Sequence, residues 1–255
     1  MKMKLTALIA TAAMAFTANT ASAESLRIGV DIYPPFVEMS ADGTLQGFDI
    51  DIGRALCEEL NHECEWVQQD WDGIIPGLLA KKFDVIISSM SITEERATKV
   101  DFSKKYYNSP SWFAAAEGVD WADTNEGLQS HVVGVQRATV QHDYLVARFP
   151  DVEVKLYGTP EDLYADFSTG RLDVIFADSL AMDASFLKTD QGQGYARFGG
   201  DHVDSTLMGD GAGIAVRKGE VELVEQFNAA IGTIRSNGTY GEINAKYFDF
   251  DIYGG

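Results

Sequence analysis

The segment FDVIISSMSITEER, residues 83–96, is the feature that most constrains the fold. A short apolar run changes abruptly into serines and then reaches Arg96, as expected where a buried strand leaves a sheet. The start of this segment returns in GRLDVIFADSL, residues 170–180, which finishes on Asp178 instead of serines. Ligands of open α/β sheets bind beyond the carboxyl ends of the strands. Two such units facing each other would offer hydroxyls and a cation from one side and a carboxylate from the other, which suits a small zwitterion.

Short runs rich in valine, isoleucine and leucine alternate with helical patterns, the signature of a parallel α/β sheet. They form two sets of βαβαβ order. The first set predicts strands at 26–32, 64–68 and 84–88, with helices at 48–60 and 71–82. The second predicts strands at 132–136, 152–157 and 173–177, with helices at 140–148 and 161–170.

The remaining segments predict that the chain crosses twice between two lobes. Residues 92–131 separate the sets and contain the first boundary. A strand at 211–218 and an interrupted helical region at 220–248 are too little for a third domain, so they would return to the first lobe. We predict a first lobe of residues 24–110 and 207–255 and a second of residues 111–206, with two crossover strands as the hinge. One large domain is the alternative.

Residues 1–23 have the pattern of a secretory signal peptide, with a basic start, an apolar stretch at 5–16 and a small-residue exit at 21–23. We predict cleavage after Ala23. The apolar stretch is too short to span a bilayer, and Glu24 rather than a cysteine follows the exit. Neither a membrane anchor nor a lipid anchor is therefore expected.

The chain is acidic, with 39 acidic residues against 20 basic ones and a formal net charge of −19. Nucleic acid is an unfavourable partner for such a surface. Surface solvation is the simpler explanation of this charge, and the functional alternative is that a negative field raises the encounter rate with cationic solutes.

The two cysteines, Cys57 and Cys64, lie where the first helix ends and the next strand begins. In an exported protein a disulfide is the default expectation. Closing so short a loop stabilises a fold by roughly 2 to 3 kcal/mol on the chain-entropy account, which favours a structural role. Since the four histidines are scattered, we predict no metal site and no cofactor.

Polar and aromatic residues follow the predicted strand ends and are expected to gather at one edge of the sheets. These candidates are Asp31, Tyr33, Trp71, Ser88, Ser89 and Ser91 in the first lobe, and Thr139 and Asp178 in the second. Arg96 lies just beyond the serines, and its guanidinium is a planar fork that matches a carboxylate. A solvated helix residue is the alternative for Arg96.

Other candidates also have structural alternatives. Ser91 and Thr139 stand where a strand passes into a helix, so either could be an N-cap, a position that is also compatible with carboxylate binding. Asp178 is costly to bury without a positive partner such as an ammonium, or else it caps the helix that follows. Tyr33 and Trp71 are either core aromatics or rings that sandwich an aliphatic or cationic stem.

Enzyme motifs are absent from the sequence: there is no GxSxG, Walker A, HExxH, or GxGxxG after a strand.

Several long motifs resemble the periplasmic solute-binding proteins of polar amino acid ABC importers, closest to the lysine/arginine/ornithine and histidine binders. The resemblance covers essentially the whole chain after residue 23, and the segments that carry it are LRIGVDIYPPF, LQGFDIDIGRALCEELNHEC, DWDGIIPGLLAKKFDVIISSMSITEER and NGTYGEINAKYFDFDIYGG. The resemblance implies the type II periplasmic binding protein fold, a periplasmic location, and the short-loop disulfide between Cys57 and Cys64.

The resemblance also implies a role for each candidate residue. Arg96 would grip the α-carboxylate of an amino acid, helped by the backbone N–H groups of Ser91 and Thr139. The α-ammonium would be held by Ser89, Ser91 and Asp178. The side-chain slot would be lined by Tyr33 and Trp71, with Asp31 and Ser88 at its far end.

Two positions depart from the pattern of the basic amino acid binders. One residue, not two, separates Asp31 from Tyr33, so the Asp31 carboxylate could point differently. Arg137 occupies a loop position that is commonly glycine in those relatives. If its side chain enters the cleft, an extra cation would favour an acidic or opine-like ligand.

The sequence thus predicts a monomeric, secreted receptor that closes its lobes around lysine, arginine or ornithine and delivers it to a membrane ABC permease, without chemistry on the ligand. The alternatives are the same role with histidine, glutamine, another neutral or aromatic, an acidic or an opine ligand; sensing for a chemoreceptor; and a periplasmic dehydratase-like enzyme on the same fold.

Overall fold

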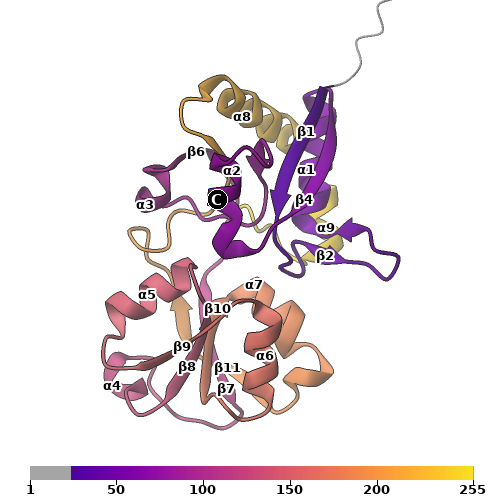
Figure 1. Ribbon diagram of the computed structural model, residues 1–255. Coiled ribbons are helices and arrows are strands. Elements are labelled where there is room, and N and C mark those ends of the chain that lie inside the picture. The colour runs from indigo at the N-terminus through magenta and orange to yellow at the C-terminus, as the bar shows by residue number, and fades with distance from the viewer. Residues whose placement is uncertain (1–23, 255) are drawn as a thin grey trace, which may run out of the picture.

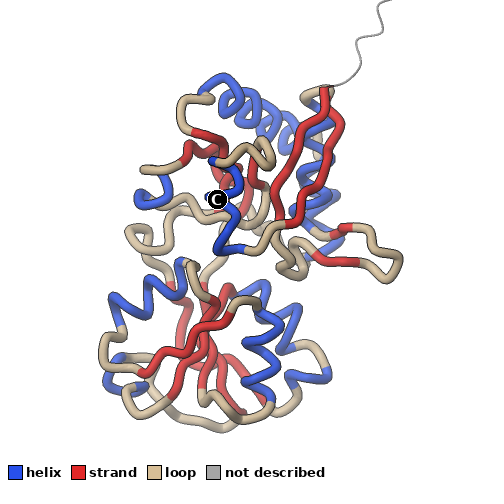
Figure 2. Tube along the Cα trace, in the orientation of Figure 1, coloured by secondary structure: helices blue, strands red, loops and turns tan. Residues whose placement is uncertain are grey.

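The computed structural model describes residues 24–254, which form two lobes, each a five-stranded sheet flanked by helices (Figure 1). Figure 2 shows helices on both sides of the sheet in the second lobe. Residues 1–23, where the signal peptide is predicted, lie outside the described part. Within residues 24–254, no helix is long and apolar enough to cross a membrane.

The first sheet has the strand order β4-β1-β5-β12-β6. Its strands are β1 (Glu24–Val30), β4 (His62–Gln68), β5 (Val85–Ile86), β6 (Val100–Tyr107) and β12 (Ala212–Arg217). The first three are parallel to one another, and β12 is antiparallel to β5 and β6. The helices of this lobe are α1 (Phe48–Glu59), η1 (Trp71–Gly73), α2 (Ile74–Leu79), α3 (Glu94–Ala97), α8 (Val221–Ser236) and α9 (Thr239–Tyr247), and β2 (Glu38–Met39) pairs with β3 (Leu45–Gln46) in a small hairpin.

The second sheet has the order β11-β7-β10-β8-β9 and repeats the same plan. Its strands are β7 (Ser111–Ala116), β8 (Val132–Gln136), β9 (Glu153–Tyr157), β10 (Val174–Asp178) and β11 (Tyr195–His202). Its helices are α4 (Asn125–Leu128), α5 (Val140–Arg148), α6 (Pro160–Ser168), α7 (Ser179–Met182), η2 (Asp183–Leu187) and η3 (Asp190–Gly192). The repeated Asp-Val-Ile segments form β5 and β10, the third strand of the parallel set in each sheet.

The predicted two-lobed α/β fold is confirmed, and the strands of the two predicted βαβαβ sets, β1, β4 and β5 and then β8, β9 and β10, are parallel within each set. Each sheet contains one antiparallel strand, β12 in the first and β7 in the second. Strands β6, β7 and β11 were not predicted. The sequence of β6, VDFSKKYY, lacks an apolar run because only some of its side chains are buried.

Each lobe has its own aromatic core. In the first lobe the ring centroids of Phe36 and Tyr107 lie 4.7 Å apart in a stack, and the Phe48 ring meets both edge-on. In the second lobe Phe113 stacks on Phe176 at 4.3 Å. Burying one such ring stabilises the fold by about 1.5 to 3 kcal/mol. Each lobe therefore has a hydrophobic core of its own that holds its helices against its sheet.

Two chain segments join the lobes, one from β6 to β7 and one from β11 to β12. The second contains Gly211, whose φ of 113° lies in a region that other residues rarely adopt. A Cβ atom at Gly211 would lie 2.5 Å from the carbonyl oxygen of Tyr107, at the end of β6. The two connections therefore touch, and this position requires glycine for both reasons.

The disulfide between Cys57 and Cys64 is present and links the last turns of α1 to β4.

Candidate functional site

A cavity of about 710 Å³ lies between the lobes. All nine residues predicted as ligand contacts line it: Asp31, Tyr33, Trp71, Ser88, Ser89, Ser91, Arg96, Thr139 and Asp178. The structure thus brings together side chains from the strand ends of both sheets. Their roles toward a ligand stay predictions.

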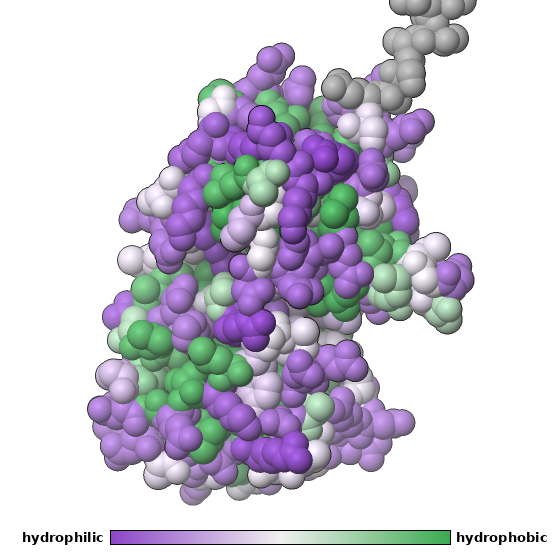
Figure 3. Space-filling model, in the orientation of Figure 1, coloured by the Kyte–Doolittle hydropathy of each residue, from purple (hydrophilic) through white to green (hydrophobic). Residues whose placement is uncertain are grey.

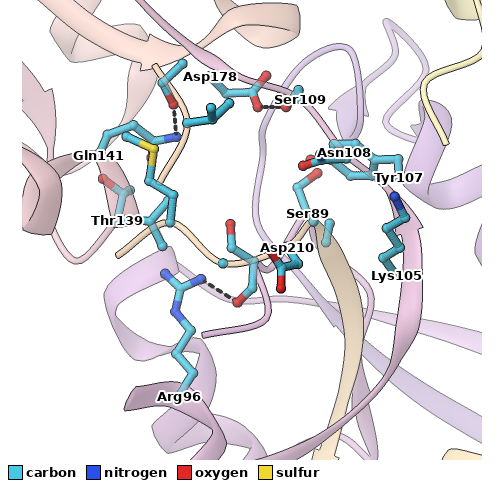
Figure 4. Close-up of a pocket in the computed structure, with 18 of the residues that line it drawn as sticks. Ser89, Arg96, Lys105, Tyr107, Asn108, Ser109, Thr139, Gln141, Asp178 and Asp210 are labelled. Carbon is cyan, nitrogen blue, oxygen red and sulfur yellow. Dashed lines mark hydrogen bonds between the residues drawn. The ribbon is translucent and has the colours of Figure 1, made fainter. Parts of the chain in front are cut away.

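Arg96 is held at the cavity by backbone carbonyls (Figure 4). Its guanidinium donates to the carbonyl oxygens of Ser91 at 3.1 Å and of Ala138, in the other lobe, at 3.4 Å. The side chain is buried, and burial lowers the pKa of Arg96 to about 10, so it remains a cation at neutral pH. These two bonds leave further N–H groups of the fork for a carboxylate. The alternative of a solvated helix residue is wrong.

Asp178 ends β10 and caps α7. Its Oδ1 accepts hydrogen bonds from the N–H groups of Leu180 and Ala181 at 2.9 and 3.0 Å, and its Oδ2 accepts one from the hydroxyl of Ser109. Burial raises the pKa of Asp178, while these bonds act in the opposite direction. The helix-cap interpretation is correct, and the same carboxylate also faces the cavity, so the two interpretations are compatible.

Thr139 is the N-cap of α5, as one interpretation predicted. Its Oγ1 accepts from the N–H of His142 at 3.2 Å and donates to the carbonyl of Gln136 at 2.7 Å. The same interpretation is wrong for Ser91, because Thr93 caps α3 instead. Ser91 forms an isolated β-bridge with residue 212.

Asp31 and Ser88 lie together at the cavity wall. The backbone N–H of Asp31 donates to Ser88 Oγ at 2.9 Å. Burial raises the pKa of Asp31 to about 6, the N–H of Ile32 opposes this rise, and the nearby carboxylates of Asp70 and Asp72 add to it. A cation bound beside Asp31 would relieve this cost of burying its charge.

Asp49, which the sequence analysis missed, is buried and accepts a hydrogen bond from Ser89. Ser89 has a φ of 52°, in the left-handed region, and its Oγ donates to Asp49 Oδ2 at 2.8 Å. The Tyr106 hydroxyl accepts from the Ser89 N–H at 3.0 Å and donates to Asp49 Oδ1 at 3.0 Å. Burial raises the pKa of Asp49 to about 7. Its position between Phe48 and Ile50, on the apolar face of α1, is a signal that could have revealed it.

The side chain of Arg137 does not line the cavity. Its Nε donates to Oδ2 of Asp72, on the opposite lobe, at 2.6 Å. An acidic or opine ligand was favoured only if the Arg137 side chain entered the cleft. Because the side chain lies outside the cavity, this reason for such a ligand no longer holds. Asp31 and Tyr33 both reach the cavity although only one residue separates them.

The connections between the lobes add residues that were not predicted. These include Tyr107, Asn108, Ser109, Ser111, His202 and Asp210. For the first four, the signal was the polar and aromatic run SKKYYNSPSWF, which the sequence analysis treated only as a boundary.

Residues 26–250 match the model of the bacterial extracellular solute-binding proteins, family 3. The chain belongs to this family. An L-arginine-binding protein of Pseudomonas aeruginosa is 46% identical to this solute-binding protein over 237 residues, covering 92% of each chain. A lysine/arginine/ornithine-binding periplasmic protein of Escherichia coli is 40% identical, covering 91% of this chain and 90% of the relative.

Solved structures agree with this assignment. An ancestral arginine-binding protein bound to arginine superposes with a TM-score of 0.81 at 34% identity, over 89% of this chain and 99% of its own. An ancestral amino acid-binding protein described as a precursor of cyclohexadienyl dehydratase superposes with a TM-score of 0.77 at 29% identity, over 88% of this chain and 95% of its own. The fold of this solute-binding protein is therefore the two-lobed type II fold that the resemblance implied.

Within residues 24–254, no group of three or more His, Cys, Asp or Glu side chains is arranged to hold a metal ion.

Proposed function

We propose that this chain is the substrate-binding component of an ABC amino acid importer and binds a cationic L-amino acid by closing its lobes. The observation that carries the proposal is that Arg96 of the first lobe and Asp178 of the second line one cavity. Figure 4 shows the two side chains reaching that cavity from opposite sides. A zwitterion that satisfies both charges binds the closed state better than the open one, which is the condition for closure by a ligand.

The α-carboxylate of the ligand pairs with the Arg96 fork and with the N–H groups of Ser91 and Thr139, the latter at the start of α5. The α-ammonium donates to Asp178, Ser91 and Ser89. The proton of the Ser89 hydroxyl is committed to Asp49, so its oxygen lone pairs are left to accept from an ammonium.

The ligand side chain extends between Tyr33 and Trp71 toward Asp31 and Ser88. A terminal amine or guanidinium pairs with the buried Asp31 carboxylate. A neutral side chain leaves that carboxylate unpaired, which disfavours glutamine and similar ligands. The names of the relatives make arginine the first ligand to test, ahead of lysine, ornithine and histidine.

The proposal includes export and partners. Cleavage after Ala23 releases a monomer into the periplasm, where it meets a membrane permease complex. The lobes move as units of residues 24–110 with 207–255, and of residues 111–206. Relatives named as periplasmic binding proteins support this location.

A calorimetric and thermal-shift screen of ligand-stripped protein tests the ligand. A ligand that binds only the native state stabilises it by about 4 kcal/mol at a thousandfold excess over Kd, so the melting temperature ranks the candidates. We expect arginine, lysine and ornithine to shift melting more than histidine or glutamine. Stabilisation by glutamate or an opine, with no response to arginine, would contradict the proposal.

The family and the relatives are binding proteins, and we propose that this chain performs no chemistry on its ligand. Because one of the similar structures is described as a precursor of cyclohexadienyl dehydratase, a dehydratase is the enzyme alternative to test. Incubation with a chorismate-derived dehydratase substrate, followed by chromatography, should show no turnover above buffer. Sustained turnover that is lost on mutation of cavity residues would reverse the conclusion.

A further inference from the structure

Two neighbouring residues of the first lobe meet two neighbouring residues of the second. The Trp71 Nε1 donates to the carbonyl oxygen of Ala138 at 2.8 Å. Asp72 pairs with Arg137 at 2.6 Å, and both side chains of this pair remain about half exposed. Trp71 belongs to the cavity wall, whereas Asp72 and Arg137 do not line the cavity. The ion pair therefore joins the lobes without occupying the space of a ligand.

The second lobe holds its half of this contact in place by itself. The backbone N–H of Arg137 donates to the carbonyl of Tyr157 at 2.9 Å, and Ala138 has a φ of 59°, in the left-handed region. A Cβ atom at Gly158 would lie 2.8 Å from Arg137 Nη1, so the guanidinium lies against a backbone that has no side chain. This loop presents the guanidinium to the opposite lobe, where Asp72 is its one ion-pair partner within residues 24–254.

We propose that Asp72 and Arg137 form a latch that favours the closed state and slows ligand release. The latch is an addition to the proposed function and rests on it. Both are positioning residues, because neither lines the cavity. An exposed ion pair is worth little, so the latch changes the release rate by about two- to fivefold, and salt weakens it. Trp71 is excluded from the latch because its ring also borders the cavity.

A double-mutant cycle on arginine release tests the latch. Stopped-flow dissociation should be about two- to fivefold faster for Arg137→Ala and for Asp72→Asn, while the double variant should be no faster than either alone. The charge swap, Arg137→Asp with Asp72→Arg, should return release to within about twofold of the wild type. Arg171→Ala is the matched control, because Arg171 pairs with Asp166 at 2.8 Å inside the second lobe. Additive effects, unchanged release or no recovery in the swap would overturn the latch.

A measurement without amino acid tests the latch independently of which ligand the protein binds. Fluorescence energy transfer between dyes on the two lobes should report a longer mean distance for Arg137→Ala than for wild type without amino acid, and high salt should lengthen only the wild-type distance. Gly158→Ala, which crowds the guanidinium, should act like Arg137→Ala and add nothing to it. Equal distances in all of these proteins would overturn the latch even if arginine binds. A failure of arginine, lysine and ornithine alike to bind would contradict the proposed function, whereas this ligand-free measurement would still decide whether the latch exists.

Discussion

The guanidinium carbon of Arg96 lies 5.2 Å from the centroid of the Trp71 ring. The same two side chains donate to one acceptor, the carbonyl oxygen of Ala138 in the second lobe. The residue proposed to bind the carboxylate and the residue that contacts the other lobe therefore share an acceptor. A substitution of either residue is expected to change both ligand binding and the contact between the lobes.

Arg96→Ala should abolish measurable arginine binding, a loss of at least about a hundredfold, because a buried fork that pairs with a carboxylate is removed. The melting temperature of the ligand-free protein should change little. Calorimetry and thermal melting of the same samples check both statements. A large loss of stability without ligand would instead identify a structural arginine.

Trp71→Phe should weaken arginine binding by about three- to tenfold, since the phenyl ring keeps the stacking face but loses the Nε1 donor to Ala138. Trp71→Ala should weaken it further because the ring is lost as well. Titration calorimetry of the three proteins gives the order. Equal affinities for the phenylalanine and wild-type proteins would show that the indole N–H has no role in closure.

Asp31 should make arginine affinity depend on pH. Its pKa is about 6 in the ligand-free protein, and a bound cation lowers it, so below pH 6 binding must release a proton. Affinity should be constant above about pH 7 and fall as pH decreases from 6 to 5, by up to about tenfold per pH unit. Titrations at pH 5, 6, 7 and 8 measure this slope.

Asp31→Asn should flatten that slope and weaken lysine and arginine binding. Glutamine binding should not weaken, because the buried carboxylate that a neutral side chain leaves unpaired is gone. If both lysine and glutamine bind the variant as they bind the wild type, Asp31 does not contact the ligand.

Asp49 should make stability depend on pH. Its pKa is raised from 3.8 to about 7 in the folded protein, so between these values the folded state holds more protons than the unfolded state. The free energy of unfolding therefore falls as pH rises through this window, and the loss is complete above about pH 7. Compared with Asp49→Asn, the wild type should lose up to about 1.4 kcal/mol per pH unit. Urea unfolding of both proteins from pH 5 to 8 measures this difference. The same pH dependence of the free energy of unfolding in the two proteins would contradict this assignment.

Replacing Cys57 and Cys64 by alanine should lower the free energy of unfolding by roughly 2 to 3 kcal/mol, because the short loop is no longer closed in the unfolded chain. Arginine affinity should be unchanged, since neither cysteine borders the cavity. Urea unfolding and calorimetry measure the two effects separately.

The sequence predicted strands whose side chains form a mostly buried apolar run, as in β5 and β10, and helices with a clear N-cap, as in α5. It did not predict β6, because the two lysines and the polar, partly buried positions of this strand leave it without an apolar run. The antiparallel direction of β7 and β12 was not predicted either. The antiparallel β12 joins a sheet whose other strands lie more than a hundred residues earlier, and local sequence carries no record of that pairing.

The cavity-lining side chains were predictable because the carboxyl ends of parallel strands share one edge. The hydrogen-bond and ion-pair partners that hold such side chains in place were less predictable. Asp49 lies on a helix and reaches Ser89 only after the sheet is assembled, and the bond from Arg137 to Asp72 joins two lobes whose relative position no local pattern encodes.

Figure 3 shows a mainly hydrophilic surface over both lobes, with hydrophobic residues gathered on one side of the second. Val146 of α5 and Leu156 of β9 are exposed in that lobe.

The second sheet comes from one uninterrupted stretch of chain, β7 to β11, whereas the first sheet lacks a central strand until β12 arrives. In the proposed export, the amino-terminal segment has the edge of β5 uncovered until β12 follows, whereas the second sheet already has all its strands once β11 has crossed. We therefore expect the second lobe to be able to fold before the first is complete. A truncation just before residue 212 would leave the later lobe able to fold and the earlier one open along its middle, with an exposed edge available to pair with other chains.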